Sequence, residues 1–289
     1  MFLVYINDIV DIVDCNVKLF ADDTCLYINI DPKDQASIVQ CGRQINNDLK
    51  NILNWANQWL VTFNANKTKT MVISNRNVIN HPDIIFDNVV LENVQSHKHL
   101  GLTMDRKLGW SEHVDNILQS SSKMLDVTRK LQYKLDRASL DIIYQSYIRP
   151  KLEYASQIWD NCTDTDVKRL ENFQLSAARV VTGAKKGTSH ERLYCETNWE
   201  TLKDRRQNTK LCHMHKIVNR NVPDYLVELL PKKIGDCTRA NVRNKENIRN
   251  IFCRTTRYSK SFIPSTIKLW NDLDLETRSI DDIELFKSK

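Results

Sequence analysis

The stretch Val17-Lys18-Leu19-Phe20-Ala21-Asp22-Asp23-Thr24-Cys25-Leu26-Tyr27-Ile28 places two adjacent aspartates between two short arms. Apolar and polar residues alternate in both arms, which is the period of a β-strand. The pattern predicts a strand, a tight turn and a second strand, with both carboxylates at the tip. We expect the arms to be buried and to fix the turn in place.

Asp22 and Asp23 are candidate metal ligands, because Mg²⁺ prefers carboxylate and water oxygens. A solvated turn is the alternative, since aspartate is common in turns, where its side chain bonds nearby backbone groups. The residues that follow in the sequence help to distinguish these two interpretations.

The composition describes an ordinary soluble chain. Its 289 residues suit one large domain or two smaller ones, and 41% hydrophobic with 27% charged residues is typical of a globular core. None of the 6 glycines forms a Gly-rich loop, which argues against a Walker or dinucleotide site. No apolar run has the length of a membrane span, and the start lacks the basic region of a signal peptide.

The 8 cysteines include no Cys-x-x-Cys, so reduced thiols inside a cell are expected. We therefore expect an intracellular protein, nuclear or cytoplasmic, that is neither secreted nor membrane-bound. Cys212-His213-Met214-His215 has no zinc-finger spacing and is interpreted as a helix surface rather than a metal site.

Charge is unevenly distributed along the chain. Residues 1–100 carry 8 Lys and Arg against 11 Asp and Glu, a net charge of −3, whereas residues 101–289 carry 34 against 25, a net charge of +9. An acidic front that holds metal and a basic rear that holds phosphates suit an enzyme acting on nucleic acid. Ordinary surface charge is the alternative.

The front of the chain mixes the two kinds of periodicity. Asp31-Pro32-Lys33-Asp34 is a helix-start signal, and the apolar spacing after it predicts a helix over 35–60 that packs on the sheet. Residues 2–13 are expected to form the end of a helix. Strand candidates follow at 70–74, 84–91 and 99–105, and the second of these is a hairpin with Asp87-Asn88 as its turn.

The rear of the chain is expected to be helical, with almost no strand candidates. The spacing predicts helices over 110–135, 137–147, 167–181, 199–218 and 262–273. Pro150 and Gly183 are expected to end the second and third of them. The change of character at 106–110 separates a mixed part from an all-helical part, which makes the fold class α+β.

The most basic window lies at residues 232–260. Two aromatic residues, Phe252 and Tyr258, are interleaved with its cations, which are Lys232, Lys233, Arg239, Arg243, Lys245, Arg249, Arg254, Arg257 and Lys260. Cations for phosphates and aromatic rings for base stacking suit RNA or single strands. A solvated loop is equally compatible with this pattern.

Phe20-Ala21-Asp22-Asp23 resembles the aromatic-Ala-Asp-Asp box of reverse transcriptases, in the form found in non-LTR (LINE-type) retrotransposons. Other blocks resemble that family in the same order: residues 1–9, Trp59-Leu60 with the Asn64–Thr68 segment, and 99–102, which is similar to the primer-grip region. Residues 148–155, 170–179 and 262–273 resemble the region after the polymerase in jockey- and CR1-like elements. The resemblance covers nearly the whole chain, and the order and number of the blocks carry it.

The resemblance implies the second half of a polymerase palm over 1–106, made of antiparallel β-hairpins with a packed helix. A helical thumb-like region over 107–220 and a basic helical C-terminal region over 221–289 would follow it. By the resemblance, Asp22 and Asp23 hold Mg²⁺ for nucleotidyl transfer, and Leu100 and Gly101 belong to a primer grip. Lys67 would contact the incoming triphosphate, with a solvated loop lysine as the alternative. The implied partners are an RNA template and a DNA primer.

The family's order also implies a further catalytic Asp and a fingers region before residue 1. The chain is therefore expected to be an N-terminally truncated fragment of an RNA-directed DNA polymerase, with little or no activity alone. A non-catalytic nucleic-acid-binding protein or a decayed retroelement protein is the alternative. A helical protein-interaction module, resting on the rear half alone, is the third possibility.

Overall fold

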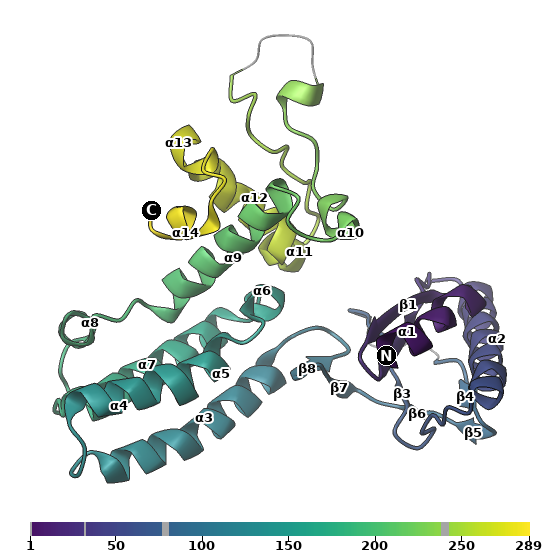
Figure 1. Cartoon of the computed structure of the whole chain (residues 1–289), viewed down its shortest axis with the longest axis horizontal. Helices are drawn as coiled ribbons and strands as arrows, with labels where there is room; N and C mark the ends of the chain where they lie inside the picture. The colour runs from purple at the N-terminus through teal and green to yellow at the C-terminus, as the bar shows by residue number, and fades with distance from the viewer. Residues whose placement is uncertain (1, 32, 77–80, 238–242) are drawn as a thin grey trace. The chain divides into compact units, whose positions relative to one another are not determined.

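A computed structural model describes residues 2–31, 33–76, 81–237 and 243–289 (Figure 1). The chain forms two compact units, Met1–Gly109 and Trp110–Lys289. Helix and strand are both present, so the expected mixture is confirmed; the polymerase names given to its parts stay a prediction. In the described part of the chain, no helix is long and apolar enough to cross a membrane.

The first unit carries short strands around one long helix. Its elements are α1 (Phe2–Ile6), the 3₁₀ helix η1 (Asn7–Ile12), β1 (Asn16–Phe20), β2 (Asp23–Tyr27), α2 (Gln35–Trp59), β3 (Lys69–Thr70), β4 (Ile85–Phe86), β5 (Val89–Val90), β6 (Glu92–Asn93), β7 (Ser96–His99) and β8 (Leu102–Asp105). β1–β2, β4–β5 and β7–β8 are antiparallel hairpins, and β3 pairs with β6 in parallel.

Helix α2 organises the core of this unit, as its apolar spacing predicts. The Asp34 side chain caps its first turn by accepting a hydrogen bond of 2.9 Å from the Ala36 N–H. Its buried face packs against η1, the β1–β2 hairpin and β4 through Leu49, Ile52, Trp55, Ala56, Ile9, Leu19, Leu26 and Phe86.

The helix expected over residues 2–13 is confirmed for residues 2–12, as an α-helix up to Ile6 and a 3₁₀ helix from Asn7. Two other expectations for the front of the chain need correction. Only Lys69–Thr70 forms a strand where 70–74 was predicted. Residues 99–105 do not form one strand: β7 and β8 meet at Leu100 and Gly101, both with positive φ (46° and 83°). A glycine that accepts positive φ allows the tight turn there. The hairpin with Asp87-Asn88 as its turn is confirmed.

The second unit is helical, apart from an isolated bridge between Lys233 and Ile248 in its described residues. Its elements are α3 (Ser111–Leu131), α4 (Arg137–Ile143), the π-helix η2 (Tyr144–Ile148), α5 (Arg149–Glu153), α6 (Ser156–Trp159), α7 (Asp164–Thr182), α8 (His190–Thr197), α9 (Leu202–Val218), α10 (Asp224–Val227), the 3₁₀ helix η3 (Gly235–Cys237), α11 (Thr256–Lys260), α12 (Phe262–Asp272), α13 (Leu275–Arg278) and α14 (Ile283–Lys287).

Pro150 does not end its helix, contrary to the prediction. The helical path runs from Arg137 to Glu153 and passes through a π turn at Tyr144–Ile148 just before the proline. A proline has no N–H and its ring crowds the preceding turn of an α-helix. The wider π turn relieves this conflict and lets the chain continue as a helix.

Helix α9 is the centre of a second core. Met214 and His215 are fully buried against α12 and α14, where they meet Ile267, Trp270 and Phe286. The interpretation of Cys212–His215 as a helix surface is therefore wrong for two of its four residues. His215 Nε2 lies 2.7 Å from the Ile280 carbonyl oxygen, which gives this buried ring a structural role.

Candidate metal and nucleic-acid sites

The β1–β2 hairpin presents the two aspartates as the sequence predicts. Phe20 pairs with Asp23, so Ala21 and Asp22 form a two-residue turn, with Ala21 at a φ of 53°. Both aspartates are exposed. The geometry leaves the two carboxylates accessible at a tip and close together along the chain.

The arms of this hairpin are only half-buried, which corrects the expectation that they are buried. Val17, Leu19 and Leu26 pack on the core around α2, whereas Phe20 is 62% exposed on the outer face. β1 alternates between exposed and half-buried residues because successive side chains of a strand point to opposite sides of the sheet.

Helix α2 fixes the chain immediately before the hairpin. The fully buried carboxylate of Asp48 accepts hydrogen bonds from the backbone N–H groups of Asp14 (3.1 Å) and Cys15 (2.8 Å). The Asn51 amide donates to the Ile12 carbonyl at 3.1 Å. Burial, with the neighbouring Asp48 carboxylate, raises the pKa of the Cys15 thiol to about 12. These contacts position the start of β1.

Asp48 was missed from the sequence, although a signal was present. It shares the apolar face of α2 with Ile45 and Ile52, at spacings of three and four residues. An acid on a buried face needs partners, since an unpaired buried charge is costly. The sequence did not reveal which backbone groups would supply them.

Lys67 lies in a turn after α2. Its backbone N–H donates to the Asn64 carbonyl at 3.1 Å, and Thr68 Oγ1 donates to the same carbonyl at 3.0 Å. The Lys67 side chain is exposed. Leu100 and Gly101 lie at the β7–β8 turn, where Leu100 is 36% exposed. Whether these residues contact a nucleotide or a primer remains a prediction.

A metal at the hairpin would find two carboxylates from this chain. No group of three or more His, Cys, Asp or Glu residues that could hold a metal ion occurs among the described residues. Mg²⁺ keeps several waters and takes one or two carboxylates together with substrate phosphates. Asp22 and Asp23 therefore fit part of such a ligand set.

Backbone hydrogen bonds join two described parts of the basic window. Ile234 N–H donates to Asn247 O at 2.9 Å, and Gly235 N–H donates to Lys245 O at 2.8 Å. The Asn271 amide of α12 fixes one arm by accepting from Ile248 N–H (3.0 Å) and donating to Ile248 O (2.8 Å).

The side chains of this window face outward. Lys233 pairs with Glu246 at 2.9 Å, and the remaining predicted contact residues that the structure describes are also exposed, namely Lys232, Arg243, Arg249, Arg254 and Arg257. Arg239 lies outside the described residues. The two aromatic residues are exposed as well: Phe252 is 84% and Tyr258 47% accessible. Exposed cations and exposed aromatic rings thus lie on the same segment.

The chain is similar to polymerases of mobile elements. It is 27% identical over 178 residues to the RNA-directed DNA polymerase from mobile element jockey of Drosophila melanogaster, a match that covers 61% of this chain and 19% of that protein. The probable RNA-directed DNA polymerase from transposon X-element of Drosophila melanogaster is 26% identical over 178 residues, with 57% and 18% covered.

The probable RNA-directed DNA polymerase from transposon BS of Drosophila melanogaster is 21% identical over 217 residues, covering 70% of this chain and 23% of that protein. The chain spans about a fifth of the length of these curated relatives. No family model matches it, and no solved structure matches it. The predicted resemblance is confirmed: the chain is related in sequence to LINE-type reverse transcriptases.

Proposed function

We propose, from this relationship to retrotransposon polymerases, that the chain is a palm-and-thumb portion of an RNA-directed DNA polymerase. Asp22 and Asp23 are its metal-binding catalytic carboxylates, and its basic second unit binds the RNA template and DNA primer. When bound, Mg²⁺ stabilises the attacking and leaving oxygens of nucleotidyl transfer. This chain's own contribution is to hold two carboxylates at a fixed tip.

The β1–β2 hairpin is the observation that carries the proposal. Two adjacent exposed carboxylates repel each other weakly in water, and a bound cation would relieve this repulsion. Here the pair stands on strands whose inner face is packed on α2 and whose start is fixed by Asp48. The carboxylates are therefore preorganised for a cation.

Metal binding by the hairpin is directly measurable. Mn²⁺, a paramagnetic substitute for Mg²⁺, should broaden the amide NMR signals of residues near Asp22 and Asp23. The double variant Asp22→Asn, Asp23→Asn should lose this broadening at the hairpin. Asp87→Asn is the matched control, because Asp87 is an exposed aspartate at another hairpin turn without an acidic neighbour. Unchanged broadening in the double variant would contradict the assignment.

We expect this chain alone to extend a primer poorly. Two carboxylates from one hairpin provide a small part of the ligands that two metal ions need in an in-line displacement. The test is primer extension on an RNA template with Mg²⁺ and deoxynucleotides. Robust extension that Asp22→Asn abolishes would show an autonomous polymerase and overturn this expectation.

A non-catalytic nucleic-acid-binding role is the second candidate, favoured by the exposed rings and cations of the 232–260 window. Asp22→Asn should leave RNA affinity unchanged under both candidates. The two separate when Asp22→Asn is placed in the full-length parent polymerase: only the catalytic candidate predicts loss of DNA synthesis. Under either, RNA affinity must fall as salt rises, because phosphate contacts release counterions.

A further inference from the structure

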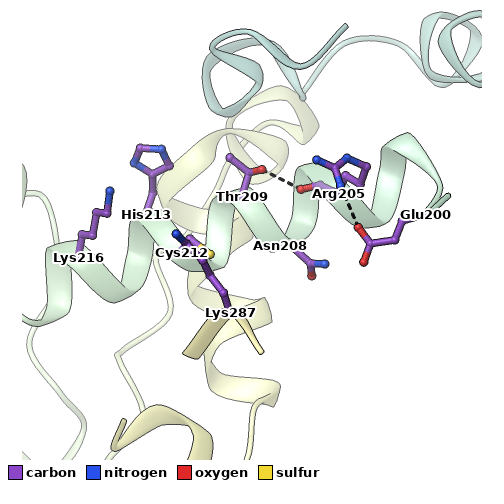
Figure 2. Close-up of a pocket in the computed structure, with 8 residues that line it drawn as sticks. All are labelled: Glu200, Arg205, Asn208, Thr209, Cys212, His213, Lys216 and Lys287. Atoms are coloured by element: carbon purple, nitrogen blue, oxygen red, sulfur yellow. Dashed lines mark hydrogen bonds and ion pairs between the residues drawn. The ribbon is translucent and has the colours of Figure 1, made fainter. Parts of the chain in front are cut away.

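A polar groove of about 360 Å³ follows one face of α9 in the second unit (Figure 2). The side chains that matter for its chemistry are Arg205, Asn208, Cys212, His213 and Lys216 on α9 and Lys287 on α14. Arg205, Asn208, Cys212 and Lys216 recur at spacings of three or four residues and so share a face, and His213 lies beside Cys212. At about 1.5 Å per residue, Arg205 and Lys216 are separated by roughly 16 Å along the axis.

Two cations of the groove are available to a ligand. Among the described residues, Lys216 has no ion pair, and Lys287 pairs only with Glu284, at 2.7 Å. Both partners of that pair are exposed, 47% and 74%, so it is weak and a phosphate can replace Glu284. Arg205 differs, because Glu153 binds its guanidinium through two oxygens in a less exposed setting. Glu200, a carboxylate that lines the groove, also pairs with Arg205, at 3.2 Å.

Cys212 and His213 lie beside these lysines in the groove, and both side chains are uncharged at neutral pH. Burial raises the pKa of the Cys212 thiol, although Lys287 and Lys216 act in the opposite direction, so the sulfur stays protonated at neutral pH. Partial burial, with the nearby Lys216 ammonium, lowers the pKa of His213 and keeps its imidazole neutral. Because Arg205 is paired with Glu153 and Glu200, the cations of the groove that remain for a phosphate are the ammonium groups of Lys216 and Lys287.

We propose that this groove binds a backbone phosphate of single-stranded RNA, with Lys216 and Lys287 as charged ligands and the Asn208 amide as a neutral donor. The inference rests on the proposed function, which brings RNA to this unit, and adds a contact outside the 232–260 window. The volume lies at the small end for ligand sites and suits one nucleotide unit. The His213 ring supplies a surface on which a base can stack.

The test measures RNA binding by the full chain with a labelled oligouridylate, by fluorescence anisotropy over a range of salt concentrations. The groove variant is Lys216→Gln with Lys287→Gln. The control is Lys203→Gln with Lys268→Gln, which removes the same charge from exposed positions of α9 and α12 outside the groove. Each lost phosphate contact should lower the slope of log affinity against log salt by about 0.7. The groove variant, which loses the one proposed phosphate contact, should lose about that amount, and the control little.

A second measurement locates the contact. The oligouridylate should slow alkylation of Cys212 several-fold, measured by mass spectrometry, and leave exposed Cys195, outside the groove, unchanged. Equal protection of Cys212 by polyglutamate of matched charge would overturn the assignment to RNA, since the groove would then select only charge.

The outcomes separate this inference from the proposed function. If the unaltered chain binds no RNA, both fail. If it binds RNA and the groove variant matches the control in affinity and salt slope, only the groove assignment fails. A larger loss of slope in the groove variant, with Cys212 protected, supports both.

Discussion

At the residue scale, the side chains that determine the geometry of the candidate metal site are not the ones that would touch the metal. Asp48 binds two backbone N–H groups two and one residues before β1. Asn46 has a similar part at β4, where its amide donates to Asp83 O (2.9 Å) and accepts from Ile85 N–H (2.8 Å). These two side chains of α2 thus bind backbone groups of the segments that lead into β1 and β4.

Asp48→Asn should destabilise the first unit. The substitution keeps one acceptor oxygen but turns an amide donor toward a backbone N–H, which costs about 1–3 kcal/mol in unfolding free energy. Hydrogen exchange of residues 12–20, followed by mass spectrometry, should accelerate, while the second unit stays unchanged. Asn47→Ala on the exposed side of the same helix is the control. Exchange at the rate of the unaltered chain would refute this role of Asp48.

Asp166 should make the second unit sensitive to acid. Burial raises its pKa, but hydrogen bonds from Thr163 and Ser111 and the Arg169 guanidinium outweigh this and hold the pKa below its ordinary value of 3.8. A lowered pKa stabilises the folded state above the unfolded pKa, and this stability is lost as the pH falls through the folded pKa.

Urea denaturation at a series of pH values tests this effect. Asp166→Asn should lower the unfolding free energy by a constant amount above about pH 5, and the difference should shrink below the ordinary carboxyl pKa. Asp164→Asn, at an 85% exposed position in the same helical turn, should change little at any pH. A difference that is independent of pH would show that Asp166 acts through packing alone.

At the element scale, turns and helix ends are determined by a few residues with positive φ. The β4–β5 turn uses Asp87 and Asn88, and the β7–β8 turn uses Leu100 and Gly101. Helix α7 ends at Gly183, whose φ of 69° is left-handed. An L-residue with a Cβ is strained in that region, whereas glycine and, to a lesser degree, asparagine adopt it.

Gly183→Ala should therefore destabilise the second unit by about 1 kcal/mol. A Cβ at this position would find only Gln132 Nε2, at 3.8 Å, so the cost comes from the backbone and not from a clash. Gly183→Asn should recover most of the loss, because asparagine tolerates the left-handed conformation. Thermal unfolding of the three proteins measures this order; equal midpoints for the alanine and asparagine variants would contradict the conformational explanation.

At the scale of the whole molecule, net charge changes sign along the chain, and the proposed roles divide with it. The two carboxylates stand in the acidic front, and most of the excess cations stand in the second unit. A positive surface attracts nucleic acid of any base sequence, because it interacts with the phosphate backbone. Aromatic rings add a contribution that salt does not screen, which makes the two contributions experimentally separable.

Phe252→Ala and Tyr258→Ala should each weaken binding of a single-stranded RNA by about 1–3 kcal/mol, the worth of one stacked base. The salt slope should stay unchanged, because neither ring is charged. The Phe252→Ala substitution should also leave folding unaffected, because Phe252 is 84% exposed. Tyr133→Ala, at a 90% exposed position outside the window, is the control for anisotropy measurements. Losses of RNA affinity equal to that of the control would show that the two rings do not contact the RNA.

The sequence alone determined the local elements of this protein and its relationship to retrotransposon polymerases. Helix α2, the Asp22-Asp23 hairpin and the end of α7 at Gly183 follow from apolar period, turn residues and caps, which act within a few residues. The order of blocks around Phe20–Asp23 carried the resemblance to LINE-type reverse transcriptases. The roles of Lys67, Leu100 and Gly101 stay predictions, because they concern ligands and not this chain's own contacts.

Only the tertiary structure decided which polar groups meet. The partners of Asp48 lie 33 and 34 residues away along the chain, and the groove joins α9 to Lys287, far along the sequence. The helix through Pro150 and the burial of His215 also depend on neighbours that local patterns do not specify. Periodicity shows which face of an element is buried, whereas the groups opposite that face are set by how distant segments pack.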